Sequence, residues 1–443
     1  MNSTASPTQP HDPWIAFRHG SFWLFLMANF AVILGGQMQA TSVLWEVHKR
    51  THNYLDLGNI GLAQFLPVLA FALVGGRAAD RFNRKVVLLL GICALLMSSV
   101  GLALTSLFSG PVWTVYFWLV LAGIAKAFVQ PAKASFLPLI VPAAAFPNAV
   151  SWNMGAFQLA TIGGPVLAGL LIEWSGNVAT VYLTDAALIV CSLVGLLFVR
   201  RMNLQQRSEV VVGFFTAVKD GLLFTWNQRL LFAAITLDML AVLFGGATAL
   251  FPVFAEEILQ VGPGGMGAMR AAMGLGALAM SLWLAWHPPM RRAGDRLMVA
   301  VGLFGVTTIV FALSRSYWLS LTALFVMGAV DMISVVIRHT LVQMVTPDEM
   351  RGRVSAINGI FIGASNELGA FESGATAHLM RSETDPTAGA VRSAFTGGIG
   401  TILVMLWVRW KWPELAQWGR ETPGVGHRSD GSHSPTSGDQ TPP

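Results

Sequence analysis

Long apolar runs separated by short polar segments dominate this sequence. A helix needs about 20 mainly apolar residues to cross a hydrocarbon layer about 30 Å thick, because each residue rises about 1.5 Å. Twelve runs approach or exceed this length, so the pattern predicts an all-α integral membrane protein with twelve spanning helices. The predicted spans are Ser21–Leu44, Leu57–Ala79, Val86–Leu107, Val112–Ile140, Asn148–Trp174, Val178–Phe198, Leu230–Ala255, Gly265–Trp286, Leu297–Leu313, Trp318–Met344, Val354–Met380 and Ala394–Val408.

The polar segments divide the chain into five predicted parts. Residues 21–200 and 230–412 each form a bundle of six helices, joined by a polar cytoplasmic linker at 201–229. Residues 1–20 form a cytoplasmic tail, and 413–443, rich in Gly, Ser, Pro and Thr, form a disordered one. The first apolar run is too long for the apolar region of a cleaved signal peptide, so we expect it to remain as the first helix.

Lys and Arg residues are spread unevenly over the two sides of the predicted helices. With a cytoplasmic amino terminus, most basic residues of the connecting segments fall on the cytoplasmic side. Only Lys49, Arg50, Arg315, Arg381 and Arg392 fall on the other side. Cytoplasmic loops carry an excess of Lys and Arg. The pattern therefore predicts an even number of crossings, both termini in the cytoplasm, and a location in a bacterial inner membrane.

The two halves of the chain also resemble each other. A gapless shift that places the fourth and fifth spans over the tenth and eleventh aligns charged, glycine and proline positions. The aligned pairs are Gly123 with Gly328, Lys126 with Asp331, Lys133 with Arg338, Pro142 with Pro347, Asn153 with Asn358, and Gly164 with Gly369. Chance can align glycines and prolines, but two intramembrane charged pairs favour a duplication into parallel repeats about an axis normal to the membrane.

Composition agrees with a bilayer as the main solvent. Of the 443 residues, 54% are hydrophobic and 12% are charged, against about 25% charged in soluble proteins. The net charge of +5 comes from scattered basic residues without interleaved aromatics, so no nucleic-acid partner is expected. Cys93 and Cys191 lie in apolar runs without ligand spacing, and no metal site is expected.

The segment between the second and third spans carries the most specific motif. It reads Gly76-Arg77-Ala78-Ala79-Asp80-Arg81-Phe82-Asn83-Arg84-Lys85. This resembles the loop signature of the major facilitator superfamily, Gly-x-x-x-Asp-Arg-x-Gly-Arg-Arg/Lys. Asn83 replaces the usual glycine, and Asn also tolerates left-handed backbone angles. The resemblance covers nearly the whole chain and implies a monomeric transporter of two pseudo-symmetric six-helix bundles in the lipid bilayer.

In that family the loop steadies one end of the transport cycle near the eleventh helix. The resemblance therefore makes Gly76, Asp80, Arg81 and Arg84 candidates for a gating loop. From the residues alone, Gly75 and Gly76 let the second helix approach a neighbour closely. Positive-inside charge is the alternative explanation for most of the basic residues.

Two further segments point towards export. Gly164, Pro165 and Gly169 resemble a degenerate antiporter motif of drug and proton exchangers, although helix packing explains small-xxx-small spacing equally well. Residues 346–359 and 363–374 resemble the transmembrane secretion effectors, the branch that includes the enterobactin exporter. Resemblance to this branch rests chiefly on these two segments.

Charged side chains inside the predicted spans are the main candidate site, because they are costly at membrane depth unless they face a cavity or a partner. In the family the first, fourth, seventh and tenth helices line a central cavity, and the third, sixth, ninth and twelfth face lipid. Asp185 on the sixth span is the exception to this rule. The candidate residues are Lys126 and Lys133 on the fourth span, Asp238 on the seventh, Arg270 on the eighth, Asp331 and Arg338 on the tenth, and Glu367 and Glu372 on the eleventh.

We hypothesise that Asp331 and Glu367 bind protons and pair alternately with Lys126 or Arg338 during transport. Static ion pairs that hold the helices together are the alternative. Many proton-driven exporters carry an arginine motif on the fourth helix, where this chain has Lys126 followed by Gln130 and Pro131. Lysine can hold the same charge but lacks the planar fork of arginine.

Neutral polar residues in the spans have two interpretations. They bind substrate, or they form hydrogen bonds between helices. These candidates are Asn29, Gln37, Gln39, Gln158 and Thr161. For His339 and His378 the alternatives are proton relay and packing.

No phosphate-binding glycine-rich loop, HExxH or GxSxG motif occurs in a credible context, so no catalytic residues and no cofactor are expected. We expect a secondary transporter that uses the proton gradient to export a small metabolite, siderophore or drug by antiport. An importer or lipid flippase of the same fold, a non-transporting membrane sensor and an intramembrane enzyme are the alternatives. The sequence leaves substrate, direction and stoichiometry open.

Overall fold

The computed structural model describes residues 12–200, 214–288 and 291–420, and within these ranges all regular structure is helical. A short π-helix, η5 (Phe254–Ile258), follows α9. The α-helices are α1 (Gly20–Thr51), α2 (Tyr54–Arg81), α3 (Arg84–Leu107), α4 (Val112–Phe136), α5 (Phe146–Ser175), α6 (Ala179–Phe198), α7 (Phe214–Asn227), α8 (Arg229–Gly245), α9 (Phe251–Val253), α10 (Gly262–Trp286), α11 (Ala293–Leu313), α12 (Tyr317–Val345), α13 (Arg351–Leu379), α14 (Ala388–Lys411) and α15 (Pro413–Gln417).

The predicted spans correspond to helices of membrane-crossing length. In the described residues, 11 helices are long and apolar enough to cross a membrane. The predicted eleventh span corresponds to α13, which has 29 residues but is more polar and carries Glu367 and Glu372. A helix whose polar side faces protein rather than lipid can keep such residues. The predicted twelve-helix arrangement therefore fits.

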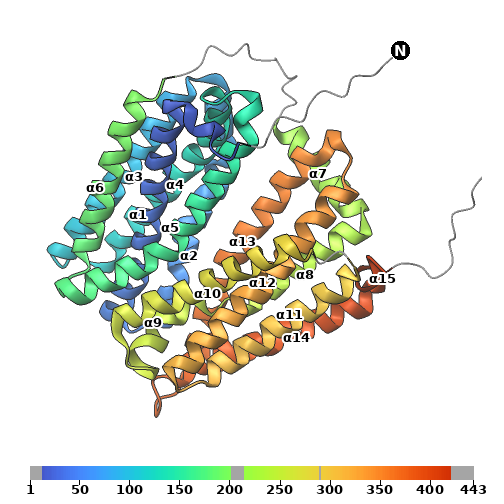
Figure 1. The fold of residues 1–443 in the computed structure, drawn as a ribbon. Coiled ribbons are helices and arrows are strands. Elements are labelled where there is room, and N and C mark those ends of the chain that lie inside the picture. Colours follow the sequence, from blue (N-terminus) through green and yellow to red (C-terminus); the bar gives the residue numbers. More distant parts are fainter. Residues whose placement is uncertain (1–11, 201–213, 289–290, 421–443) are drawn as a thin grey trace, which may run out of the picture.

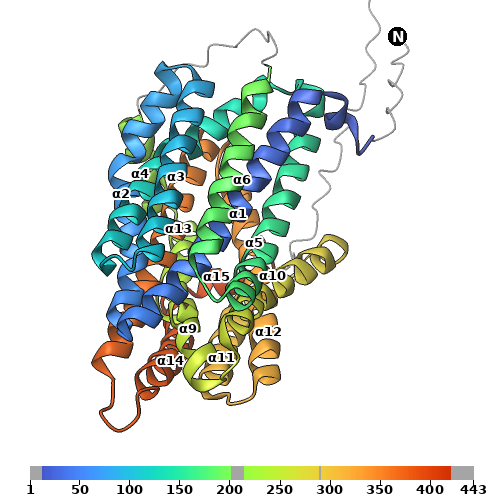
Figure 2. The ribbon, with the colours of Figure 1, turned by 90° about the vertical axis from the view of Figure 1, so that its left-hand side faces the viewer.

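The spanning helices form two bundles (Figure 1). Helices α1–α6 make the N-terminal bundle, and α8 and α10–α14 make the C-terminal bundle. Figure 2 looks onto α3 and α6, which lie on the side of the N-terminal bundle away from its partner. In the C-terminal bundle α11 and α14 pack together in the corresponding outer position (Figure 1). The bundles touch through α2 with α13 and through α5 with α10.

Glycines reveal the relation between the two bundles. A β-carbon at Gly123 of α4 would lie 2.5 Å from the Gln64 carbonyl oxygen of α2, and one at Gly328 of α12 would lie 2.0 Å from the Met273 carbonyl oxygen of α10. Neither contact leaves room for a side chain. The aligned glycines thus make the same close helix contact in each bundle, as a duplication predicts.

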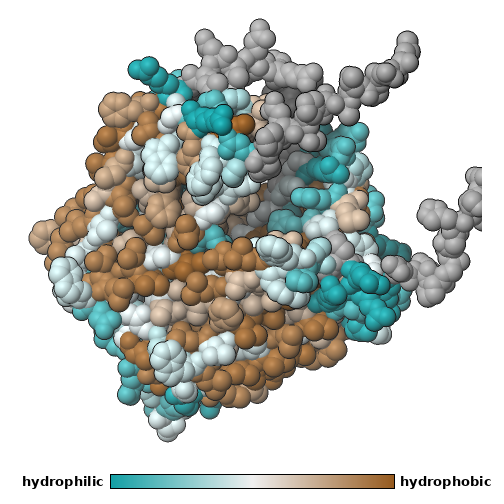
Figure 3. Space-filling model, in the orientation of Figure 1, coloured by the Kyte–Doolittle hydropathy of each residue, from teal (hydrophilic) through white to brown (hydrophobic). Residues whose placement is uncertain are grey.

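Large apolar side chains cover much of the outer surface. Trp174, Trp286 and Leu379 are each more than 80% exposed. Figure 3 shows broad hydrophobic areas over both bundles, with hydrophilic residues gathered towards their ends. Apolar exposure of this extent is stable in lipid and not in water.

The helix ends define two faces of the molecule. The terminus face holds the start of α1, the end of α6, α7 and α15, and it includes a hydrogen bond from the Arg200 amide to Ser21 Oγ of 3.2 Å. The distal face holds the α1–α2 junction, η5 and the α13–α14 connection. In Figure 1 the terminus face of the N-terminal bundle is at the top.

Part of the predicted tail and linker is helical. Residues 413–420, assigned above to a disordered tail, form α15 and the turn after it. Leu415 is fully buried there, and Arg420 Nε donates to Asp295 Oδ2 at 2.8 Å. This assignment was wrong because buried and charge-paired contacts stabilise a polar segment whose composition alone indicates disorder. The linker contains α7, and the rest of the tail, 421–443, lies outside the described residues, as do 1–11 and 201–213.

Asn83 also differs from expectation. Its φ is −61°, so it does not adopt the left-handed conformation that the family glycine suggested. Instead its side-chain oxygen accepts hydrogen bonds from the amides of Lys85 at 3.0 Å and Val86 at 3.4 Å. Asn83 is therefore the N-cap of α3, where its side chain satisfies free amides at the helix start.

The glycine contacts predict a matched pair of stability effects. Gly123→Val and Gly328→Val should each destabilise the protein by about 1–3 kcal/mol, because the added side chain collides with a backbone carbonyl. Thermal unfolding of purified protein in detergent measures this effect. Gly155→Val on α5 is the control, since a β-carbon there meets no atom within 4 Å. Equal unfolding temperatures for all three variants would contradict the repeat packing.

Candidate functional site

A cavity of about 720 Å³ lies between the two bundles. Its apolar wall includes Phe25, Val32, Ile33, Met273 and Phe304. Its polar lining comes from both halves of the chain. The polar residues are Asn29, Gln37, Gln39, Gln64, Ser99, Lys126, Gln130, Lys133, Thr161, Asp185 and Ser192 from the first half, and Thr248, Arg270, Asp331, Asn366 and Glu367 from the second.

Five of the eight predicted intramembrane charges line this cavity: Lys126, Lys133, Arg270, Asp331 and Glu367. Lys126 Nζ donates to Gln64 Oε1 at 2.9 Å. In the described part of the chain no ion pair joins any of these five to an opposite charge. Glu367 is nevertheless near enough for its charge to act on both Lys126 and Arg270. The cavity therefore holds both signs of charge without pairing them.

The remaining three predicted charges lie elsewhere. Arg338 forms an ion pair with Asp238 of α8, and its Nε donates to Ser334 Oγ at 3.2 Å. Both charged side chains are at least 90% buried. Neither belongs to the cavity lining, so the hypothesis that Arg338 pairs with Asp331 or Glu367 is corrected for this conformation. Asp238 on the neighbouring helix satisfies this guanidinium instead.

Glu372 is likewise outside the cavity lining. Its Oε1 accepts a hydrogen bond of 2.8 Å from Thr376 Oγ1 on the same helix. Glu367 and Glu372 are five residues apart on α13, so they point in different directions around the helix. Only Glu367 points into the space between the bundles.

Asp185 belongs to α6, a helix that was expected to face lipid, but it lies on an inner side of the helix that also carries the buried Tyr182 and Ile189. It is 1% exposed, and its Oδ2 accepts a hydrogen bond of 2.5 Å from Ser99 of α3. Gln39 Nε2 of α1 donates to the same Ser99 oxygen at 3.1 Å. A β-carbon at Gly35 would lie 2.0 Å from Asp185 Oδ1, so only glycine leaves room for this carboxyl group. The Asp185 carboxyl group is also close enough to Lys126 for an electrostatic interaction between the two side chains.

The neutral candidates divide between the cavity and the helix contacts. Gln37 and Thr161 line the cavity, whereas Asn29 lines it and also donates to Asn153 Oδ1 at 2.6 Å. Gln158 Nε2 donates to the Gly274 carbonyl oxygen at 3.4 Å, so it joins α5 to α10 and is not part of the lining. For Gln158 the helix-contact interpretation fits better.

The two histidines are not in the cavity lining. His339 of α12 is exposed. His378 Nδ1 lies 3.2 Å from Asn53 Oδ1, at the distal face. The packing interpretation therefore fits His378, which joins α13 to the start of α2.

Glycines on α5 and α10 bring the two bundles together. A β-carbon at Gly169 would lie 2.4 Å from the Pro263 carbonyl oxygen, and one at Gly267 would lie 2.3 Å from that of Pro165. Gly164 instead packs against Gln37 and Leu34 of α1. The helix-five residues Gly164, Pro165 and Gly169 thus form close contacts, and Gly169 does so across the junction of the bundles.

Close contacts between α2 and α13 also occur in their distal halves. A β-carbon at Gly61 would lie 2.8 Å from Glu367 Oε2, and one at Gly374 would lie 2.6 Å from the Tyr54 carbonyl oxygen. Towards the terminus face, β-carbons at Gly76, Gly155 and Gly359 would meet no atom within 4 Å. The bundles are therefore closed at the distal face and separated at the terminus face.

The predicted gating loop lies at this separated end. Asp80 and Arg81 are exposed, Arg84 is partly exposed, and Lys85 Nζ donates to the carbonyl oxygens of Leu197 and Val199 on the N-terminal bundle. Gly75 approaches the Ala127 carbonyl oxygen of α4 as expected, but Gly76 does not make a close contact. The expectation for Gly76 was wrong because its free side faces the open end.

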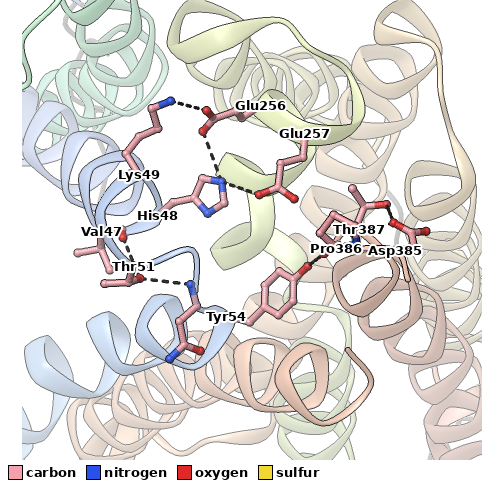
Figure 4. A network of polar contacts seen from close by, with 11 residues as sticks. Val47, His48, Lys49, Thr51, Tyr54, Glu256, Glu257, Asp385, Pro386 and Thr387 are labelled. Carbon is pink, nitrogen blue, oxygen red and sulfur yellow. Dashed lines mark hydrogen bonds and ion pairs between the residues drawn. The ribbon is translucent and has the colours of Figure 1, made fainter. Parts of the chain in front are cut away.

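Polar contacts at the distal face join the same two bundles (Figure 4). The Tyr54 hydroxyl donates to the Pro386 carbonyl oxygen, and Lys49 forms an ion pair with Glu256. Next to Pro386, the Thr387 hydroxyl and amide each donate to Asp385 Oδ1 at 2.8 Å, which lowers the pKa of the Asp385 carboxyl group. The Tyr54–Pro386 hydrogen bond and the Lys49–Glu256 ion pair would have to break for the distal face to open.

The predicted seventh span is interrupted beside the cavity. Helix α8 ends at Gly245, and a short turn and α9 follow Gly246. The Gly246 carbonyl oxygen accepts a hydrogen bond of 2.9 Å from Ser373 Oγ, so a neighbouring helix satisfies the interrupted backbone. Broken helices that line a cavity are a feature of transporter binding sites.

Two helical bundles around a charged cavity define the protein as a membrane transporter of small molecules. The family model of the Major Facilitator Superfamily matches residues 25–370, and the chain belongs to this family.

Curated relatives of the chain are exporters. The multidrug efflux pump Tap of Mycolicibacterium fortuitum is 26% identical over 364 residues, which are 80% of this chain and 88% of the relative. The enterobactin exporter EntS of Salmonella choleraesuis (strain SC-B67) is 26% identical over 417 residues, with 92% of this chain and 95% of the relative covered. The resemblance to exporters of the superfamily that the motifs indicated is confirmed.

Solved structures show the same fold at low identity. A bacterial homologue of the iron transporter ferroportin, in an inward-facing state, has a TM-score of 0.68 at 13% identity and covers 88% of this chain and 98% of its own. A bacterial homologue of the lysosomal transporter Spinster has a TM-score of 0.67 at 14% identity, with coverages of 94% and 100%.

The buried Asp238–Arg338 ion pair should contribute to the stability of the fold, and this contribution can be measured without a transport assay. Asp238→Asn and Arg338→Gln should each destabilise the protein by about 3–5 kcal/mol, because each leaves one buried charge without its partner. The double variant should recover part of that loss. Thermal unfolding in detergent gives the three values, and additive losses would contradict a buried pair.

Proposed function

We propose that this protein exports a small molecule from the cytoplasm across the inner membrane by proton-coupled antiport. The observation that carries the proposal is the position of Glu367. It lies on α13 at the junction of the bundles, with Oε2 against Gly61 of α2 and its charge within reach of Lys126 and Arg270. Protonation of this one group would change the electrostatics of both halves.

Export is supported by the relatives, and the conformation shows from which side a substrate would enter. Tap and EntS are named as an efflux pump and an exporter. The cavity is closed at the distal face, so a substrate would enter from the terminus face. We assign this face to the cytoplasm because it carries most of the basic residues of the connecting segments, including Arg200, Arg291, Arg292 and Arg296.

The cavity suits a small amphipathic substrate. A volume of about 720 Å³ falls within the range of about 300–1,000 Å³ that drug-sized ligands occupy. Its apolar wall would bury the body of such a molecule. Lys126, Lys133 and Arg270 would then orient anionic or acceptor groups, and Asp331 would orient a cationic group.

Three carboxyl groups are the proposed proton carriers: Asp185, Asp331 and Glu367. All three line the cavity, and in the described ranges none forms an ion pair with Lys or Arg. A proton that binds to Glu367 from the outside would travel with this side chain until the cavity opens to the cytoplasm. Its release there would restore the negative charge, which a cationic group of the substrate would then bind, so proton and substrate would occupy the carboxyl group in turn.

Alternating access would follow from the glycine contacts. Opening to the outside requires α5 to separate from α10 and α2 from α13 in their distal halves, while the gating loop closes on the opposite bundle. Asp80 is exposed and a β-carbon at Gly76 would meet no atom within 4 Å, so we propose that these two residues would make that closing contact. We expect the monomer in the bilayer to be sufficient, with no cofactor.

The proposal predicts separate effects for the carboxyl groups. Asp331→Asn and Glu367→Gln should abolish uptake into inverted vesicles driven by an imposed pH gradient, because each removes a proton site. Substrate exchange without a gradient should persist, since it needs no net proton movement. The labelled compounds to screen are those that the names of the relatives give, enterobactin and a panel of drugs.

Glu372→Gln is the matched control, because it alters a glutamate of the same helix outside the cavity lining. It should retain gradient-driven uptake. Full activity of both Asp331→Asn and Glu367→Gln, at native amounts in the membrane, would refute proton coupling through these groups. Equal uptake with and without the gradient in the unaltered protein would leave a facilitator or importer as the better explanation.

A further inference from the structure

Two histidines end α1 at the distal face. His48 lies in the last turn, and His52 follows the helix as its C-cap with a φ of 48°. The His52 amide donates to the His48 carbonyl oxygen at 2.9 Å, and the two imidazole rings are 5.5 Å apart between centroids. This spacing of four residues places both rings on one side of the helix end.

The C-terminal half presents two adjacent glutamates to these rings. Glu256 and Glu257 belong to η5, and Figure 4 shows both beside His48. His48 Nε2 lies 3.3 Å from Glu257 Oε1 and 3.4 Å from Glu256 Oε2. A single π-helical turn is uncommon and is often found at functional sites.

The polar atoms of this cluster are incompletely satisfied. The His48 side chain is 2% exposed, yet neither of its ring nitrogens has a hydrogen-bond partner, and Glu256 Oε2 also lacks one. Buried polar atoms are usually hydrogen bonded, so this group of unpaired atoms calls for an explanation. One imidazole N–H cannot serve two carboxylates at once.

The charges around the cluster leave Glu257 uncompensated. Lys49 pairs with Glu256, and Arg50 pairs with Glu46, which also accepts a hydrogen bond of 2.6 Å from Tyr182. In the described part of the chain, the ion-pair partner of Glu257 is His48 alone. A cation bound between His48 and Glu257 would neutralise this carboxylate.

We propose that His48, His52 and Glu257 form a binding site for a first-row divalent transition metal ion, Zn²⁺ in particular. One ligand atom from each residue lies within 4.8 Å of the other two. Tetrahedral zinc with bonds of about 2.0–2.2 Å places its ligands roughly 3.4 Å apart, which side-chain rotation can reach. Glu256 Oε2 or a water molecule supplies the fourth ligand.

The donor set decides the kind of ion. Two neutral imidazoles and a carboxylate suit zinc and its neighbours in the first transition row. Ca²⁺ and Mg²⁺ prefer oxygen ligands throughout, so they are poor candidates for a site in which imidazole predominates. The other explanation for the cluster is a protonated His48 shared between the two glutamates, which the test below separates from metal binding.

The site spans the two halves of the transporter. His48 and His52 belong to the N-terminal bundle, whereas Glu257 belongs to the C-terminal half. The three ligands meet only while the distal face is closed. By linkage, an ion that binds this conformation alone stabilises it against opening. External Zn²⁺ therefore holds the cavity open to the terminus face, an effect that stands whether or not transport is proton-coupled.

Binding of Zn²⁺ alone to the purified full-length chain, made with a tag free of histidine, tests the site. Isothermal titration in detergent should give one tight site. His48→Ala, His52→Ala and Glu257→Gln should each weaken binding by roughly tenfold or more. His287→Ala, which removes a histidine from the terminus face, should leave it unchanged. Because the His52 side chain is exposed, His52→Ala is the substitution that should disturb folding least. A loss of Zn²⁺ binding in this variant can therefore be attributed to the lost ligand.

A second measurement reports the link to conformation. Spin labels at Trp113 and Trp318, exposed positions at the distal ends of α4 and α12, measure the separation of the bundles. In the unaltered chain, Zn²⁺ should increase the population with the shorter distance between the two labels, in which the distal face is closed. It should not change the distances in the Glu257→Gln variant.

Three results would overturn the metal site. They are the absence of a stoichiometric Zn²⁺ site, a site that the three ligand substitutions leave intact, and a distance distribution that responds to pH between 5 and 8 but not to Zn²⁺. The last of these would assign the cluster to a shared proton.

Discussion

The free-energy cost of holding a charged side chain away from water determines where the charged residues of the spanning helices lie. Within the lipid layer a charge needs a partner or a wet cavity. Asp238 and Arg338 satisfy each other inside the C-terminal bundle, whereas Lys126, Arg270, Asp331 and Glu367 face the central cavity. This division separates charges that hold the fold together from charges that can act on a substrate or a proton.

Glycine contacts determine where the two bundles can meet. Gly169 and Gly267 bring α5 and α10 into backbone contact, and Gly61 and Gly374 do so for α2 and α13. All of these contacts lie towards the distal face, where the polar contacts of Tyr54 and Lys49 also lie. The closed distal face is thus a packed interface that can separate, while Glu367 links that interface to the cavity.

Much of the fold could be predicted because lipid imposes a strict length and polarity on each helix, and a duplication repeats the same glycines and charges in both halves. The cavity positions of Lys126, Asp331 and Glu367 follow from the same constraint. The partner of Arg338, the inward direction of Asp185 and the order of residues 413–420 depend on side chains from distant segments. His48 and Glu257 likewise meet only through the packing of α1 against η5, and no local motif marks them.

In a proton-coupled antiporter, occupation of the cavity and protonation of its carboxyl groups depend on each other. The most direct measurement is the proton released or taken up when substrate is added to purified protein in weakly buffered detergent solution with a pH indicator. Proton-coupled transport should give a stoichiometric proton exchange, which the Glu367→Gln variant should lack although it still binds substrate. Substrate binding without any proton exchange in the unaltered protein, measured across pH 5 to 9, would contradict it.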